Sequence, residues 1–290
     1  MLDVLIIGSG PAGLSAAIYA SRAGLSTAVV TGDTLGGLLT TTEKIDNYIG
    51  MFGSSGVELA ENFTEHAKKF GAELVRDSVL SISKVDGVFE TVLSGGESLV
   101  SKTVVFAAGS TPRKLGVPGE GLSGVSYCAT CDGMFFEDED VAVVGGGETA
   151  AEDALYLANV ASSVTVLVRG DSWRATAPAV EKLVNHPKVN ILMNSSISEI
   201  IGEDGVSGAV INGSTTLDVT GVFVAVGQSP NSGTAESHVD LFEDGFIKCS
   251  NVEGFFVAGD IGVPEYRQVA VAVGDGAKAG IDATRFILNG

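Results

Sequence analysis

The sequence predicts an α/β protein with two parallel-sheet domains, because one pattern occurs twice in its 290 residues. Each occurrence consists of a short apolar run, a glycine-rich turn, a helix-like stretch and a second apolar run. Later in each half, a further apolar run ends at a glycine. This order is that of a βαβ unit. Two complete copies favour two Rossmann-like dinucleotide-binding domains over glycine turns that arise by chance.

The first copy begins with the apolar residues 4–7, followed by GSGPAG at 8–13, a helix-like stretch at 14–23 and an apolar run at 26–30. Glycine lets the backbone approach a pyrophosphate, and the N-terminus of the next helix presents N–H groups and the positive end of its dipole. Residues 31–33 contain no arginine. This ending suits a nucleotide without an extra phosphate, such as FAD.

The second copy has apolar residues at 141–144, GGGETA at 145–150 and an apolar run at 164–168. Arg169 and Arg174 follow that run. Guanidinium groups at this position are suited to the 2′-phosphate of NADPH, whereas an NAD site usually has an acidic residue there. The sequence therefore predicts NADPH in preference to NADH. The alternative is that both arginines are ordinary solvated surface residues.

The division into domains follows from the two later apolar runs, at 104–109 and 221–227, each of which closes one nucleotide-binding fold. A proline-marked segment follows the first run and a polar segment follows the second. An NADPH domain inserted into a split FAD domain is therefore expected. The expected parts are 1–112 (FAD domain, first part), 113–240 (NADPH domain) and 241–290 (FAD domain, second part).

Composition limits the class of protein. The formal net charge of −19 repels phosphate backbones and anionic lipids, which argues against nucleic acid or a membrane as the main partner. An acidic surface that maintains solubility explains this charge. The chain has no uninterrupted apolar run of about 18 residues, and Asp3 stands where a signal peptide would be basic. A soluble, cytoplasmic protein is expected.

Two of the three cysteines, Cys128 and Cys131, lie in the stretch CATCDG. Such a pair can be a metal clamp, a structural clip or a redox pair. Structural disulfides are rare in a reducing compartment, so a metal site and a catalytic pair are the main alternatives. Zinc requires about four ligands, and neither Cys249 nor the three scattered histidines form a second ligand pair. The pattern therefore predicts no metal and favours redox chemistry.

Three motifs in order, GSGPAG, CATCD ahead of GGGETA, and GFFVAGDIGVPEYRQVAVAVGDGAKAG, resemble those of the low-molecular-weight thioredoxin reductases. The resemblance extends over essentially the whole chain. The position of CATCD just before the second glycine turn is its most specific element. Related flavoproteins that reduce ferredoxin with NADPH share both folds but lack this pair of cysteines.

The resemblance implies the residues that bind each cofactor. FAD would be held at the first turn by Gly8, Gly10, Pro11, Ala12 and Gly13; near the flavin by Asn47; at the ribityl chain by Gly259 and Asp260; and at the start of the last helix by Arg267, Gln268 and Val269. NADPH would be held by Gly145, Gly147, Glu148, Thr149, Arg169 and Arg174.

The resemblance also implies roles for the redox residues. Cys131 would be the sulfur nearer the flavin, and Cys128 would attack the disulfide of thioredoxin. Asp132 would carry the proton of the dithiol; the alternative is that it caps the turn before Gly133. A homodimer formed through the FAD domain and a rotation of the two domains during turnover are further expectations from the resemblance.

The chain departs from the family pattern in places. Val168-Arg169-Gly170 stands where the family usually has His-Arg-Arg, so one basic contact is missing. The turn usually written GGQL reads GGLL at 36–39, and the segment between Asp240 and Gly259 is shorter than usual. Alternatives to an NADPH-dependent thioredoxin reductase are therefore a different donor (NADH or ferredoxin), a non-catalytic flavin-binding regulator, and a flavin oxidase with a vestigial cysteine pair.

Overall fold

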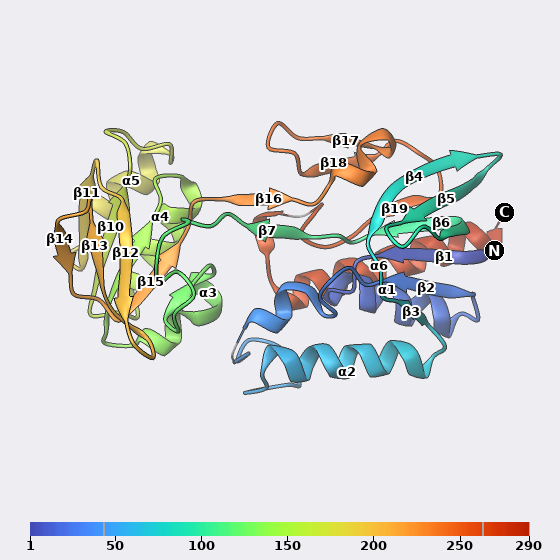
Figure 1. The fold of residues 1–290 in the computed structure, drawn as a ribbon, viewed down its shortest axis with the longest axis horizontal. Helices are drawn as coiled ribbons and strands as arrows, with labels where there is room; N and C mark the ends of the chain where they lie inside the picture. The colour runs from blue at the N-terminus through green and yellow to red at the C-terminus, as the bar shows by residue number, and fades with distance from the viewer. Residues whose placement is uncertain (43, 263, 290) are drawn as a thin grey trace. The chain divides into compact units, whose positions relative to one another are not determined.

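The computed structural model describes residues 1–42, 44–262 and 264–289 (Figure 1). The chain forms two compact units, each with its own sheets and core. Unit 1 consists of Met1–Thr111 and Ser229–Gly290, and unit 2 consists of Pro112–Gln228. Unit 2 is thus an insertion into unit 1. In each unit, helices alternate along the chain with the strands of a sheet that contains parallel pairs. This α/β arrangement agrees with the predicted class.

Unit 1 is built on a seven-stranded sheet in the order β3-β2-β1-β6-β5-β4, with β19 also paired to β6. The pairs of β1 with β2 and β6 are parallel, as the first glycine motif predicts, whereas β4, β5 and β6 form an antiparallel meander. The strands are β1 (Leu2–Ile7), β2 (Thr27–Val30), β3 (Glu73–Val75), β4 (Val79–Val85), β5 (Val88–Leu93), β6 (Ser98–Phe106) and β19 (Phe255–Val257).

The helices of unit 1 are α1 (Pro11–Arg22), α2 (Gly56–Lys69) and α6 (Val269–Asn289), with 3-10 turns η1 (Gly37–Thr41) and η4 (Pro264–Tyr266). Helices α1 and α6 pack closely through small residues. A Cβ on Gly276 would lie 2.0 Å from the carbonyl oxygen of Ala12, and the Ser15 hydroxyl donates to the carbonyl of Val273 at 2.8 Å. The first and last helices of the chain therefore share one core.

Unit 2 has a five-stranded parallel sheet in the order β11-β10-β9-β15-β8, and a three-stranded antiparallel sheet, β12-β13-β14. Alternate strand residues contribute to two cores, one shared with the helices and one shared with the second sheet. The elements are β8 (Val125–Ser126), α3 (Ala129–Asp132), η2 (Gly133–Phe136), β9 (Asp140–Val144), α4 (Glu148–Ala158), β10 (Ser163–Val168), α5 (Ala177–Val184), β11 (Val189–Met193), β12 (Ile197–Gly202), β13 (Val206–Ile211), β14 (Thr215–Leu217) and β15 (Gly221–Val224).

The two segments that connect the units pair with each other as strands β7 (Ser110–Pro112) and β16 (Gln228–Pro230). Residues 229–240, which were expected in the NADPH domain, belong to unit 1 in this division. The reason is packing: this segment forms η3 (Gly233–His238) and β17 (Val239–Leu241), and β17 pairs with β18 (Ile247–Ser250). Ala235, Val239 and Phe255 share a core in unit 1.

His238 lies in that core with only 4% of its surface exposed. Its ring stacks on Phe255 at a centroid distance of 5.2 Å, and the ring of Phe89 lies 6.0 Å away. Burial lowers the pKa of His238 below its ordinary value of 6.5, and the nearby positive charge of Lys84 lowers it further. The folded protein therefore holds this imidazole neutral at a pH at which the unfolded chain binds a proton.

This arrangement makes stability depend on pH. Below about pH 6.5 the unfolded state takes up a proton at His238 before the folded state does, so the free energy of unfolding should fall by up to about 1.4 kcal/mol per pH unit from this group. Denaturant titrations at pH 7.5 and 5.5 should show a larger loss in the wild type than in His238→Phe. His66→Gln, at an exposed site, should behave as the wild type. Equal losses in all three proteins would contradict the expectation.

No helix in the described ranges has the length and apolar character that a bilayer-spanning segment requires.

Candidate functional site

The first glycine turn connects β1 to α1 and is tightly packed on two sides. Gly8 has φ +106°, and a Cβ there would lie 2.2 Å from the carbonyl oxygen of Ala107. A Cβ on Gly13 would lie 1.8 Å from the carbonyl oxygen of Gly8. Gly10 differs, because nothing lies within 4 Å of the position of its Cβ. The turn is therefore closed towards the protein and open at Gly10.

The N-terminus of α1 faces this open side. Gly10 is the N-cap residue, no side chain caps it, and Pro11 occupies the first turn of the helix, with the predicted residues Ala12 and Gly13 after it. Uncapped N–H groups at the end of a 12-residue helix favour an anion. The shape and polarity of this cradle fit the pyrophosphate of FAD. The predicted residues Gly8, Gly10, Pro11, Ala12 and Gly13 all lie in this turn or in the first turn of α1.

Substituting Gly10 tests this cradle. Its φ of −69° is accessible to alanine, so Gly10→Ala should fold as the wild type does. The added methyl group would occupy the space where a pyrophosphate approaches, and the affinity of the apoprotein for FAD should fall at least about tenfold. Titrating apoprotein with FAD and following flavin fluorescence measures this. Gly233→Ala, also in unit 1 and in open space, is the control. Equal affinities for FAD in both variants would rule out the cradle.

Ser9 supports the same turn and was not among the predicted residues. Its side chain is buried, and its hydroxyl donates to the carbonyl oxygen of Thr31 at 2.9 Å and accepts from the N–H of Gly36 at 3.3 Å. One hydroxyl thus joins the glycine turn to the segments after β2 and before η1. A serine between two glycines has no signal in the sequence that would distinguish it from a spacer.

Gly259 and Asp260 follow β19. Gly259 has φ +80°, and its N–H donates to a carboxylate oxygen of Asp275 at 2.7 Å. Burial raises the pKa of the Asp260 carboxyl to about 6; the charge of Arg267 and the backbone N–H of Asp260 oppose this effect. A buried carboxylate gains from a hydroxyl donor. The site therefore fits the ribityl hydroxyl that the family motif implies.

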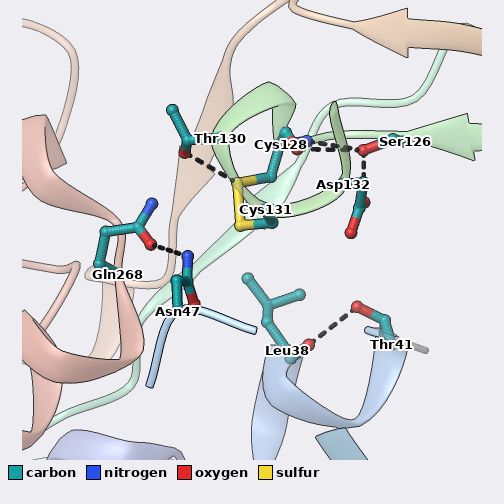
Figure 2. The surroundings of a disulfide bond; sticks show 9 residues. All are labelled: Leu38, Thr41, Asn47, Ser126, Cys128, Thr130, Cys131, Asp132 and Gln268. Atoms are coloured by element: carbon teal, nitrogen blue, oxygen red, sulfur yellow. Dashed lines mark hydrogen bonds between the residues drawn. A yellow bond between two sulfur atoms is a disulfide. The ribbon is translucent and has the colours of Figure 1, made fainter. Parts of the chain in front are cut away.

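Asn47 and Gln268 are far apart in the sequence but lie together in unit 1. The Asn47 side-chain amide donates to Oε1 of Gln268 at 3.1 Å, as Figure 2 shows. Gln268 directly precedes Val269, the first residue of α6, and Arg267 is half-buried beside it. The fold thus brings together predicted flavin-side residues of the N-terminal and C-terminal segments.

The second glycine turn connects β9 to α4 in unit 2. Gly145 has φ +156°, and a Cβ there would lie 2.4 Å from the carbonyl oxygen of Ala225. Gly147 is the uncapped N-cap residue of α4, and nothing lies within 4 Å of its Cβ position. Thr149 is exposed in the first turn of the helix. This turn repeats the shape of the first: closed at its first glycine and open at the start of the helix.

Arg174 is held beside this turn by its backbone, because its N–H donates to the carbonyl of Gly146 at 2.7 Å. Arg169 follows the end of β10, and both arginine side chains are exposed. Two guanidinium groups at this edge fit the 2′-phosphate of NADPH.

The carboxylate of Glu148 has another partner in the structure. It accepts hydrogen bonds from the N–H of Thr176 at 2.7 Å and from the Thr176 hydroxyl at 3.0 Å. Thr176 is the N-cap residue of α5. Glu148 therefore joins the first turn of α4 to the start of α5, a role that the prediction of a cofactor contact did not include.

Cys128 and Cys131 form a disulfide in unit 2, with their Cα atoms 5.3 Å apart (Figure 2). The bond spans the short helix α3, of which Cys128 is the N-cap residue. The Thr130 hydroxyl lies 3.5 Å from Sγ of Cys128. Since a disulfide sulfur carries no hydrogen, Thr130 is the donor. Both cysteines are partly exposed.

Ser126 links Asp132 to this disulfide. Its hydroxyl donates to Oδ2 of Asp132 at 2.6 Å and accepts from the N–H of Cys128 at 3.1 Å (Figure 2). Ser126 was not predicted as a site residue. Its position two residues before the first cysteine is a weak signal, because the motif draws attention only to the residues inside it.

The described residues contain no group of three or more His, Cys, Asp or Glu side chains arranged to hold a metal ion. Cys249 is exposed, and partial desolvation of its sulfur together with the neighbouring Asp240 carboxylate raises the pKa of its thiol. A raised pKa makes this thiol a poor nucleophile.

Comparisons with known proteins agree with this geometry. The family described as "Pyridine nucleotide-disulphide oxidoreductase" matches residues 2–276. A protein named "Thioredoxin reductase" from Mycolicibacterium smegmatis is 42% identical over 300 residues, covering 98% of this chain and 96% of the relative. A "Bifunctional thioredoxin reductase/thioredoxin" from Mycobacterium leprae (strain TN) is 39% identical, covering 98% of this chain and 66% of the relative. The crystal structure of thioredoxin reductase from Streptococcus pyogenes MGAS5005 is similar with a TM-score of 0.95 at 38% identity, covering 100% and 99% of the two chains.

Proposed function

Because the chain belongs to the pyridine nucleotide-disulphide oxidoreductase family, we propose from its site that it is a thioredoxin reductase. It passes electrons from NADPH through FAD and the Cys128–Cys131 pair to the disulfide of thioredoxin. The observation that supports this proposal most strongly is the disulfide of unit 2, whose neighbour Asp132 is hydrogen-bonded to Ser126. The same chain has two glycine turns that are open at the start of the following helix, as dinucleotide binding requires.

The two glycine turns have separate binding roles in this proposal. Gly8, Gly10 and Gly13 with the start of α1 would hold FAD, and Gly145 and Gly147 with the start of α4 would hold NADPH. The flavin would supply the two-electron redox chemistry that connects the nicotinamide to the disulfide. These residues position the two nucleotides without taking part in bond making or breaking.

The sulfur chemistry then proceeds in two exchanges. Two electrons and two protons convert the Cys128–Cys131 disulfide into two thiols. The thiolate of Cys128 attacks one sulfur of the thioredoxin disulfide and releases the other as a thiolate, which takes up a proton. Cys131 next attacks Cys128 in the mixed disulfide, which re-forms the bond within this chain and releases reduced thioredoxin. The Asp132 carboxyl, adjacent in the chain to Cys131, carries protons to and from the sulfurs.

Thioredoxin is supported as the partner by the relative from Mycobacterium leprae. That protein is named as both a reductase and a thioredoxin, and this chain covers only 66% of it. Joining the two activities in one chain places the donor and the acceptor disulfide together. We also propose a cytoplasmic homodimer whose two units turn about the β7 and β16 connections, so that the cysteine pair serves flavin and thioredoxin in turn.

The donor preference is open to a direct test through Arg174. Removing a guanidinium group that binds a 2′-phosphate should raise KM for NADPH about tenfold or more, with little change for NADH. Steady-state kinetics of Arg174→Ala with both nucleotides measures this. Lys182→Ala, which removes an exposed cation of α5, is the control. A parallel rise in KM for NADPH and NADH would show that Arg174 does not recognise the 2′-phosphate.

Gly170 favours a second candidate, the same disulfide chemistry with another electron donor, because one basic residue of the family pattern is missing there. Anaerobic titration of the purified yellow protein with NADPH, NADH and reduced ferredoxin distinguishes the two. Bleaching by NADPH, followed by reduction of thioredoxin, supports the proposal. Bleaching by NADH or reduced ferredoxin but not by NADPH would establish the alternative, and bleaching without thioredoxin reduction would refute both.

A further inference from the structure

The surroundings of the disulfide include a buried polar group that the proposed chemistry does not use, the hydroxyl of Ser126. We propose that Ser126 is a positioning residue, which fixes the Asp132 carboxylate and the backbone of Cys128 with one hydroxyl and favours the ionised form of the carboxylate. This proposal rests on the proposed function, in which Asp132 carries the protons of the dithiol.

The hydrogen-bonding capacity of one hydroxyl defines the arrangement. A serine has one O–H donor and two lone pairs. Two acceptors lie near it: Oδ2 of Asp132 at 2.6 Å and the carbonyl oxygen of Cys128 at 3.3 Å. The shorter distance and the negative charge place the hydrogen on the Asp132 side. A lone pair then accepts the N–H of Cys128 at 3.1 Å.

The position of Ser126 is rigid. It is the last residue of β8, which pairs in parallel with β15, and its partner in the register is Phe223. The serine is only 5% exposed and Phe223 is 1% exposed. Burial keeps water from replacing the bond to the carboxylate, so the strand transmits a fixed geometry to α3.

The chemical consequence concerns the proton of Asp132. A donor to a carboxylate stabilises the charged form more than the protonated form. Without the Ser126 hydroxyl, the carboxyl group would retain its proton to a higher pH. It would also have greater freedom to turn away from Cys131. The loss of orientation would slow proton transfer at the sulfurs, whereas the higher pKa would shift the pH at which the carboxyl gives up its proton.

The experiment measures the Asp132 carboxyl directly. Protein labelled with ¹³C at the aspartate carboxyl carbon is titrated in its oxidised form, in which Cys128 and Cys131 do not titrate, and Asp132→Asn identifies the signal of Asp132. Ser126→Ala should raise the apparent pKa of this carboxyl by about one unit. Ser195→Ala is the matched control, because Ser195 is another buried serine of unit 2 and its hydroxyl donates to a backbone carbonyl at 3.0 Å.

A second pair of variants tests the role of the hydroxyl independently of Ser126→Ala. Ser126→Thr and Ser126→Val have nearly the same shape and differ in the hydroxyl. The proposal expects a low apparent pKa with Thr and a raised one with Val. The pH profile of kcat/KM for thioredoxin should move in the same direction. Unchanged carboxyl titrations in Ser126→Ala, or equal titrations with Thr and Val, would overturn the role of Ser126. A wild type that bleaches but does not reduce thioredoxin would overturn the proposed function and leave the NMR result valid.

Discussion

Replacing Cys131 with serine is expected to reduce NADPH-dependent thioredoxin reduction by at least about 10³-fold. A serine hydroxyl does not form a disulfide, so electrons that reach the flavin have no acceptor in this chain. Bleaching of the flavin by NADPH should continue, because both dinucleotide cradles consist of other residues. Thioredoxin turnover and anaerobic flavin absorbance, measured on the same preparation, test the two parts of this expectation.

Cys249→Ser is the matched control for this experiment. It removes the remaining cysteine, which is exposed and lies outside the disulfide, and turnover should stay at the wild-type level. Cys128→Ser should behave as Cys131→Ser does. Thioredoxin turnover that survives in both variants of the pair would mean that the disulfide of unit 2 is not in the electron pathway. An oxidase with a vestigial pair would then be the better description.

Asp132→Asn is expected to lower turnover about 10²-fold, the usual size of a positioned acid–base group. Asparagine preserves the shape of the side chain but neither carries the proton nor attracts the Ser126 hydroxyl as a carboxylate does. The limb of the pH profile that reports this carboxyl should disappear. Steady-state rates between pH 4 and 9 measure both effects, and the flavin spectrum of the same sample shows whether FAD is bound.

The control for Asp132 is an exposed aspartate of the same unit. Asp204→Asn changes the net charge equally and lies in the turn between β12 and β13. Its rate and pH profile should match the wild type. If Asp132→Asn also retained the wild-type profile, Asp132 would be a turn residue before Gly133, which is the alternative that the sequence left open.

The main features of the fold could be predicted from the sequence because glycine patterns report backbone geometry. At Gly8 and Gly145 a side chain would collide with a carbonyl oxygen, so each motif marks a place where strand and turn must approach closely. The cysteine spacing likewise predicted a local pair, since three positions in the chain keep two Cα atoms within disulfide range. In each case the evidence lies within a few residues.

Other features depend on contacts between distant segments. The sequence places His238 in a polar stretch, but aromatic stacking with Phe255 draws residues 229–240 into unit 1. Glu148 stands in the second glycine motif, yet its carboxylate binds Thr176, 28 positions along the chain. Ser126 is recognisable only when Asp132 is seen to turn back towards it. A single sequence contains these residues without indicating which of them meet.

The packing of α6 on α1 implies that unit 1 can complete its core only after unit 2 has been synthesised. Unit 2 is one continuous segment, Pro112–Gln228, and emerges from the ribosome with all its strands. The sheet that begins with β1 is completed later, because α6, which covers Ala12 and Ser15, follows unit 2 in the chain. A nascent chain stopped before residue 269 would leave the apolar side of α1 uncovered. Chaperones that recognise such surfaces are therefore expected to bind the segment Met1–Thr111 of unit 1 until α6 has been synthesised.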